Sequence, residues 1–350
     1  TILVMKNKVP TIKEIAKIAN VSLMTVSRAL NNNPRVREQT RKKILNIAKE
    51  LNYRPNRIAR SLVSKRSNLI SLIVADIRNQ FFAELARGIE DKAWESGYNV
   101  IISSTDNDPK RLESQVRLMM EMGVDGFILA SVRLKEPIVD TLIQQNIPVV
   151  LVNRKLASEN VSYVVIDNHR GACLVMEHLI NHGCRNIAII NGSTDLSTCA
   201  ERLRGYKKAL AEHGLTLRPE YVANGSFTKE HGYTAAKKML SMPDRPDAIF
   251  GASDLIALGV MKAADELGLR IPDDLSLVGF DDTEFSSNPR IDLTTVSQRK
   301  YEMGRLGVQV ITEIIEGTEA NYTNRIVLEP HLIVRNSGGC EMRKSCAHST

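Results

Sequence analysis

The 350-residue sequence has few cysteines and none of the compact motifs of catalysis or metal binding. Its five cysteines include no Cys-x-x-Cys pair and no histidine at zinc-ligand spacing, which argues against a metal site and a disulfide framework. Gly-x-x-x-x-Gly-Lys, Gly-x-Gly-x-x-Gly, His-Glu-x-x-His and Gly-x-Ser-x-Gly are also missing. A triad assembled from distant positions would leave no such signature, but binding explains the sequence better. We therefore predict a non-enzymatic protein without cofactor or metal.

Long hydrophobic runs are missing as well. No apolar run approaches the ~18 residues that a membrane span needs, and no signal-peptide apolar region precedes the first predicted helix. The hydrophobic content is nevertheless 43%, which is enough for a sizeable core. The sequence predicts a cytoplasmic protein with no membrane contact, and its length suits a small module plus one or two larger domains.

Positive charge is concentrated at one end of the chain. Residues 1–66 contain 16 Lys and Arg against three Asp and Glu, whereas the remainder contains 31 against 37. An ordinary solvated surface mixes the two signs, but a basic segment on a mildly acidic body is what neutralisation of phosphates requires. Nucleic acid is the predicted partner of the N-terminal segment.

The basic segment begins with three predicted helices. Thr11 and Glu14 form a capping box, and apolar residues at helical spacing follow it: Ile12, Ile15, Ala16 and Ala19. A third helix is predicted over residues 37–51, with one apolar stripe formed by Ile44, Ile47, Ala48 and Leu51. The two would enclose a short second helix, which indicates a helix-turn-helix module.

The second helix carries the residues that would read DNA. Ser22 can cap it, and Val26, Ala29 and Leu30 face inward. The exposed N-terminal end, which in such modules enters the major groove, carries Leu23, Met24, Thr25, Ser27 and Arg28. The alternative for Leu23 and Met24 is burial in the core of the module.

A short basic segment follows the third helix. Pro55 stops that helix, and Asn56 can cap a new one whose apolar edge contains Ile58, Ala59 and Leu62. A helix below ~12 residues gains little stability alone in water, so this segment either folds against DNA or is a solvated basic linker. Composition does not decide between the two.

From Asn68 onward, apolar runs alternate with amphipathic helical stretches. Buried runs of Val, Ile and Leu between helices indicate doubly wound parallel sheets. Two lobes accommodate the strands, and their ligand is expected outside the carboxyl ends of the strands, in the cleft between lobes. The predicted strands are 69–75, 100–104, 126–130, 148–152, 187–191, 248–252 and 275–280.

Five short motifs along the chain are distinctive. They are Val21-Ser22 with Thr25-Val26-Ser27-Arg28, Tyr53-Arg54-Pro55-Asn56, Arg202 with Gly205-Tyr206, Ser253-Asp254 with Ala257-Leu258-Gly259, and Val278-Gly279-Phe280-Asp281-Asp282. Together they resemble the lactose repressor and galactose repressor family of bacterial transcription regulators. The resemblance runs from about Thr11 to about Ser337. Any one of these motifs alone would be weak evidence for the family.

The resemblance implies an all-α head with a hinge helix and a two-lobed α/β body like that of periplasmic binding proteins. The implied boundaries are a helix-turn-helix head at 1–53, a hinge helix or linker at 54–67 and an effector-binding and dimerisation body at 68–338. The first lobe takes about 68–165 and 297–327, and the second about 166–296 and 328–338. Residues 339–350 are expected to be a disordered tail.

For the head, the resemblance implies that Leu23, Met24 and Arg28 read the major groove and that Leu62 wedges into the minor groove. Arg pairs bidentately with guanine, apolar side chains touch thymine methyls, and an inserted leucine kinks the duplex. The full set of expected DNA contacts is Thr11, Ser22, Leu23, Met24, Thr25, Ser27, Arg28, Asn31, Tyr53, Asn56, Arg57, Ala59 and Leu62.

For the body, the resemblance implies a small sugar-like effector. Arg202 would clamp hydroxyls or a carboxylate, and Asp281 would accept hydrogen bonds. Phe81, Phe82 and Phe227 would cover the ligand, with Asp167 and Asp254 as second-rank candidates. The competing structural roles are a solvated or ion-paired Arg202, phenylalanines packed in a core or dimer seam, and an Asp281 that only caps. Ser253 stands where relatives often have Asn.

These expectations predict a dimeric repressor of carbohydrate-utilisation genes, because one head reads only half of a palindromic operator. The protein would act in the bacterial cytoplasm, on the nucleoid when bound. One alternative is control by a phosphorylated carrier protein, suggested by residues 83–91 and Tyr301, although Gln309 replaces the arginine expected for the phosphate. A solute-binding protein without a DNA role is the other alternative, and the basic head argues against it.

Overall fold

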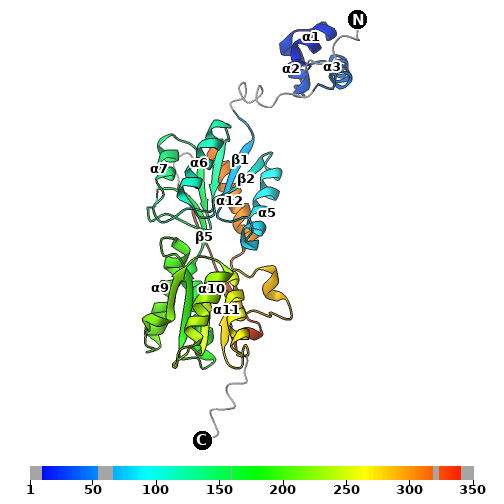
Figure 1. The fold of residues 1–350 in the computed structure, drawn as a ribbon. Helices are drawn as coiled ribbons and strands as arrows, with labels where there is room; N and C mark the ends of the chain where they lie inside the picture. The colour runs from blue at the N-terminus through cyan, green and yellow to red at the C-terminus, as the bar shows by residue number, and fades with distance from the viewer. Residues whose placement is uncertain (1–9, 54–65, 159, 318–322, 340–350) are drawn as a thin grey trace. The chain divides into compact units, whose positions relative to one another are not determined.

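The computed structural model describes residues 10–53, 66–158, 160–317 and 323–339, and the chain divides into two compact units (Figure 1). The first unit ends at Ser67, and the second begins at Asn68. The predicted contacts at Asn56, Arg57, Ala59 and Leu62 lie outside the described residues.

In its described residues, the first unit is a bundle of three helices: α1 (Ile12–Ala19), α2 (Leu23–Leu30) and α3 (Glu38–Glu50). The predicted capping box is present, and the Glu14 carboxylate accepts from the Thr11 backbone N–H at 2.8 Å. Asn20 ends α1 in the left-handed conformation, and the Ser22 hydroxyl caps α2 by accepting from the Thr25 N–H at 3.1 Å. The three helices bury one small core of their own.

The first lobe of the second unit contains a parallel six-stranded sheet in the order β11-β5-β4-β3-β1-β2. Helix α12, far along the sequence, packs beside α5 in this lobe (Figure 1). The elements are β1 (Leu69–Val74), α5 (Gln80–Glu95), β2 (Asn99–Ser104), α6 (Pro109–Glu121), β3 (Gly126–Leu129), α7 (Pro137–Gln144), β4 (Val149–Val152), β5 (Ser162–Ile166), α12 (Lys300–Glu316) and β11 (Arg325–Leu328).

The second lobe contains a parallel four-stranded sheet in the order β7-β6-β8-β9 and an antiparallel pair, β10 with β12. Isolated bridges from Val278 to Thr294 and from Asp281 to Ser297 attach this pair to the end of β9. The elements are α8 (Asn168–Asn181), β6 (Ile187–Gly192), α9 (Ser197–Glu212), β7 (Val222–Gly225), α10 (Lys229–Leu240), β8 (Ala248–Gly251), α11 (Asp254–Glu266), β9 (Ser276–Val278), β10 (Thr295–Ser297) and β12 (His331–Ile333), with 3-10 turns η1 (Pro219–Tyr221), η2 (Glu284–Ser287) and η3 (Asn336–Gly338).

Three chain segments connect the lobes. The chain passes from the first sheet into the second after β5, returns between β10 and α12, and crosses again between β11 and β12. Each lobe is therefore built from segments distant in sequence, and a cleft between the lobes lies next to these connections. Among the described residues, no helix is long and apolar enough to cross a membrane.

The predicted fold class is confirmed, and all seven apolar runs contain strands. The sequence analysis did not predict the five other strands: β5, β7, β10, β11 and β12. Of these, β10 and β12 have three residues each, and β7 and β11 are half-exposed edge strands of four residues each. Short or half-exposed strands give no long apolar run. Strand β5 is buried throughout but was not among the predicted strands.

Candidate functional site

A cavity of about 170 Å³ lies between the two lobes of the second unit. Its wall combines the loop after β1, the start of α5 and the segment after β4 from the first lobe with α9, the segment after β7 and the loop after β9 from the second. Most of these segments follow the carboxyl ends of parallel strands, where sheets of this type bind ligands.

Aromatic rings form the apolar side of the cavity. Asn79 caps α5 by accepting from the Phe81 N–H at 3.0 Å, which places Phe81 and Phe82 in the first turn of that helix. The two rings lie edge to face at 5.1 Å between centroids, and both side chains belong to the buried core. The packing role and the cavity role proposed for this pair are therefore compatible. Phe227 lines the cavity from the second lobe.

Arg202 lines the cavity from α9 and is only 2% exposed. Its Nε donates to the Asn168 side chain at 2.9 Å and one Nη to the Ala252 carbonyl at 2.5 Å. The guanidinium lies 3.6 Å from the centroid of the Phe280 ring. Because burial disfavours its charge, the pKa of Arg202 is lowered. The side chain is neither solvated nor ion-paired with a described carboxylate.

Asp281 lines the same cavity from the loop after β9. Burial raises the pKa of its carboxyl to about 7, although the neighbouring Arg202 charge lowers it. The Gln298 side-chain amide donates to the Asp281 carboxylate. Asp281 and Asp282 have φ values of 129° and 49°, which L residues seldom adopt and which tend to occur at functional sites.

Lys300 holds this loop in place. Its side chain is 3% exposed, and its Nζ donates to the carbonyl oxygens of Asp281 at 2.6 Å and Asp282 at 2.7 Å. The same Nζ lies 3.0 Å from the Glu84 carboxylate on α5 of the first lobe. One buried ammonium thus connects the loop that carries Asp281 to the opposite lobe.

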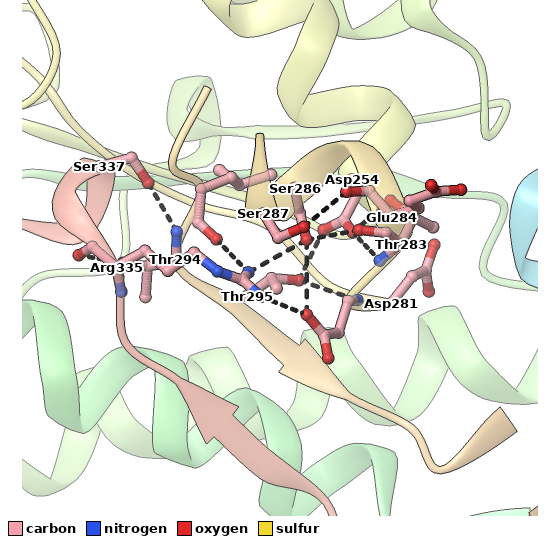
Figure 2. A network of polar contacts seen from close by, with 12 residues as sticks. Asp254, Asp281, Thr283, Glu284, Ser286, Ser287, Thr294, Thr295, Arg335 and Ser337 are labelled. Atoms are coloured by element: carbon pink, nitrogen blue, oxygen red, sulfur yellow. Dashed lines mark hydrogen bonds and ion pairs between the residues drawn. The ribbon is translucent and has the colours of Figure 1, made fainter. Parts of the chain in front are cut away.

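Asp167 and Asp254 are not among the residues that line the cavity. Asp167 caps α8 by accepting from the Arg170 N–H at 2.8 Å. Asp254 is fully buried and accepts from the Thr283 N–H and hydroxyl at 2.8 Å and from the Thr295 hydroxyl at 2.6 Å (Figure 2). These contacts fix the loop after β9.

Ser253, which stands where relatives often have Asn, also does not line the cavity. Its hydroxyl accepts from the Ile256 N–H at 3.2 Å and caps α11. The sequence analysis missed Asn153, Arg154 and Gln298, all of which line the cavity. The first two directly follow β4, and the rule that ligands bind beyond strand carboxyl ends could have found them.

In the first unit, α2 presents the predicted reading residues on its surface. Leu23 is 45% exposed and Met24 is 61% exposed, so the alternative that they lie in the core of the head is wrong. Thr11, Ser22, Arg28 and Asn31 are exposed, whereas Thr25, Ser27 and Tyr53 are half-buried. The Ser22 and Thr25 hydroxyls lie 2.9 Å apart at the start of α2.

A helix-turn-helix head on a two-lobed body with an interlobe cavity defines the class of ligand-controlled DNA-binding regulators. The pattern described as "Bacterial regulatory proteins, lacI family" matches residues 11–56, and that described as "Periplasmic binding protein-like domain" matches residues 176–338. The chain is 38% identical to catabolite control protein A of Priestia megaterium, over 92% of this chain and 97% of that protein. The chain belongs to the lacI family of bacterial regulatory proteins.

Solved structures show the same architecture. A complex of the transcriptional regulator CelR with cellobiose matches with a TM-score of 0.71 at 32% identity, covering 94% of this chain and all of that one. The Lac repressor dimer bound to operator and the anti-inducer ONPF matches with a TM-score of 0.84 at 27% identity, covering 95% of this chain and all of that one. These relatives are transcriptional regulators.

Proposed function

We propose that this regulator represses carbohydrate-utilisation genes and that a small sugar-like effector bound in the interlobe cavity controls it. The main support for this proposal is the lining of the cavity, which combines Arg202 and Asp281 with three phenylalanines. Fixed donors and acceptors with aromatic faces suit a polyol, because hydroxyls need oriented partners and ring carbons need cover. The cellobiose complex of a related regulator supports a sugar of some kind.

The head and hinge bind a pseudopalindromic operator, and two copies of the chain supply the two half-sites. We assign major-groove contacts to Leu23, Met24 and Arg28 and a minor-groove wedge to Leu62. The remaining expected contacts of the head and hinge are part of the same proposal. We place the domain boundaries at 53, 67 and 338 and the site of action in the bacterial cytoplasm, where the operator is.

Control by the effector is a coupling free energy between two sites. Ligand that binds one arrangement of the lobes better than another shifts the population toward that arrangement. The three connecting segments and the Lys300 contacts lie where such a shift would be transmitted. Because coupling is reciprocal, operator DNA must change effector affinity by the same factor as effector changes operator affinity.

Thermal unfolding against a panel of sugars, sugar acids and sugar phosphates tests the proposal. A ligand at 100 times its dissociation constant stabilises by about 2.7 kcal/mol, which is easily detected. Any hit is then added to the protein on labelled operator, where it must change the anisotropy midpoint. A compound that stabilises the body but leaves operator affinity unchanged would contradict effector control.

A second candidate is control by a phosphorylated carrier protein. The α5 and α12 surface carries Tyr301, which is 39% exposed and donates to Asp91 at 3.0 Å, and Arg305, which pairs with Glu95 at 2.9 Å. The 38% identity to a catabolite control protein favours it. Against it, Gln309 donates to Glu313 at 3.0 Å where an arginine was expected. Surface plasmon resonance with the phosphorylated and unphosphorylated carrier protein separates the two candidates.

A further inference from the structure

The interlobe cavity contains a buried guanidinium, that of Arg154, which forms no ion pair among the described residues. Arg154 follows β4, lines the cavity and is only 2% exposed. One Nη donates to the Asn107 side chain at 2.8 Å, and Asn107 is a neutral partner. The Nε is buried and finds no hydrogen-bond partner among the described residues. No described carboxylate lies within ion-pair distance of this guanidinium.

Asp195 is the acidic residue whose charge acts on Arg154, and it partly offsets the effect of burial on the Arg154 pKa. It forms no ion pair with that guanidinium: its Oδ2 pairs with Arg133 at 3.1 Å, and its buried Oδ1 has no hydrogen-bond partner among the described residues. At the exposed rim of the cavity, Asp76 pairs with Arg78 at 2.9 Å, and Asp106 forms ion pairs with Arg78 and Arg111. The rim is therefore balanced by itself, and its charges do not compensate Arg154.

Inside the cavity the charges do not balance. The buried ionisable side chains of its wall are Arg154 and Arg202 against the single carboxyl of Asp281. Burial, together with the like charge of Arg202, lowers the pKa of Arg154 to about 10, and burial keeps that of Asp281 at about 7. The cavity wall thus carries two buried guanidinium groups against one buried carboxyl group. A buried charge without a partner costs free energy that a ligand can recover.

We propose that the effector is a polyhydroxylated molecule carrying an anionic group, a carboxylate or a phosphate, and that this group binds against Arg154. This inference rests on the proposed function of the cavity and specifies its ligand class. Arg presents a planar fork of donors that matches both anions. The rest of the wall calls for hydroxyls, because the buried Gln298 Oε1 is an acceptor with no donor among the described residues.

Titration calorimetry on the full chain tests the charge requirement with matched compounds. The series are D-ribose with D-ribonate and D-ribose 5-phosphate, and D-glucose with D-gluconate and D-glucose 6-phosphate. At least one acid is expected to bind tenfold or more tightly than its neutral parent, and the series separates carboxylate from phosphate. Arg154→Met should remove that preference, whereas Arg111→Met, at the balanced rim, should retain it.

The melting temperature of the Arg154→Met variant, measured without ligand, provides a second and independent test. If Arg154 awaits an anion, Arg154→Met removes an uncompensated buried charge, and its melting temperature should rise by about 2 °C. A clear fall instead would assign Arg154 to holding the fold and overturn the inference.

The results of these experiments separate a failure of the anionic-ligand proposal from a failure of the proposed effector control. A neutral parent that binds as tightly as its acids, and still changes operator affinity, overturns the anionic ligand and leaves the effector cavity standing. A protein that binds operator but none of these compounds, with a lower melting temperature for Arg154→Met, overturns both.

Discussion

Apolar side chains are usually buried and charged side chains are usually exposed. The head and the interlobe cavity each break one half of this rule. Helix α2 exposes large apolar side chains, Leu23 and Met24, to solvent. The cavity buries Arg154 and Arg202, side chains that are almost never fully buried without a partner. Each departure lies at the surface that we assign to an external partner: base edges for the head and a polar ligand for the cavity. The rest of each unit follows the ordinary rule, with apolar cores and exposed ion pairs.

The largest expected contrast is within the head, between a buried and an exposed apolar residue. Ile15→Ala leaves a cavity in the three-helix core and should destabilise the head by about 2–5 kcal/mol. Met24→Ala should change stability by less than about 0.5 kcal/mol, because the side chain is exposed. Hydrogen exchange of head peptides in the full chain measures both. Operator affinity of the folded Met24→Ala protein should nevertheless fall; unchanged affinity would remove Met24 from the reading surface.

In the cavity, the corresponding variant is Asp281→Asn. Loss of a buried charged acceptor costs about 1.5–3 kcal/mol of ligand binding, or roughly 10- to 100-fold in affinity, while operator affinity stays unchanged. Calorimetry with the identified effector measures the loss. The matched control is Asp167→Asn, which keeps a capping side chain and does not line the cavity. Equal losses in both variants would show that the effect is not specific to the cavity.

Lys300→Met tests whether the lobes communicate through the buried ammonium. The variant removes the contacts to the Asp281 and Asp282 carbonyls and to Glu84. Coupling between sites is typically about 1–3 kcal/mol, so the factor by which effector changes operator affinity should shrink about fivefold or more. Anisotropy titrations with and without effector give that factor. Lys92→Met, whose ammonium pairs with Glu95 on the same lobe, should retain it.

The smallest expected effect is a pH dependence from Asp281. Its folded-state pKa is raised from 3.8 to about 7, so the group favours the folded, unliganded protein below pH 3.8, and this contribution is lost as the pH rises through about 7. A ligand hydroxyl needs the ionised acceptor. Effector affinity should therefore fall about threefold between pH 7.5 and 6.5, as the ionised fraction falls. Asp281→Asn should abolish this dependence in calorimetry; an unchanged slope would assign it to another group.

Much of the fold follows from local sequence. The capping box at Thr11, the Ser22 cap and the apolar spacing of three helices predict the head, because their partners lie within a few residues. Strands such as β3 and β4 are buried on both faces and appear as unbroken apolar runs. Strand β11 is different, because it joins the first sheet only by pairing with β5, some 160 residues earlier.

The candidate site divides in the same way. The resemblance to the family implied Phe81, Phe82, Arg202, Phe227 and Asp281 as effector contacts, and all five line the cavity. Asp254 belongs to an equally distinctive motif, yet its carboxylate faces the Thr283 and Thr295 hydroxyls (Figure 2). The presence of a residue in a family motif therefore does not indicate whether its side chain contacts the ligand or holds the neighbouring loop in place.

Periodicity, capping and charge along the chain are enough to predict the three-helix head, the basic N-terminal segment and the two doubly wound lobes, and local motifs are enough to indicate the family. Which polar side chains face the cavity, and which form hydrogen bonds inside the protein instead, depends on contacts between distant segments of the chain. The Arg154 guanidinium contacts the neutral side chain of Asn107, and the Lys300 ammonium contacts both lobes because β10 leads directly into α12. Such facts are distances between residues far apart in sequence, and only the packing of the lobes sets them.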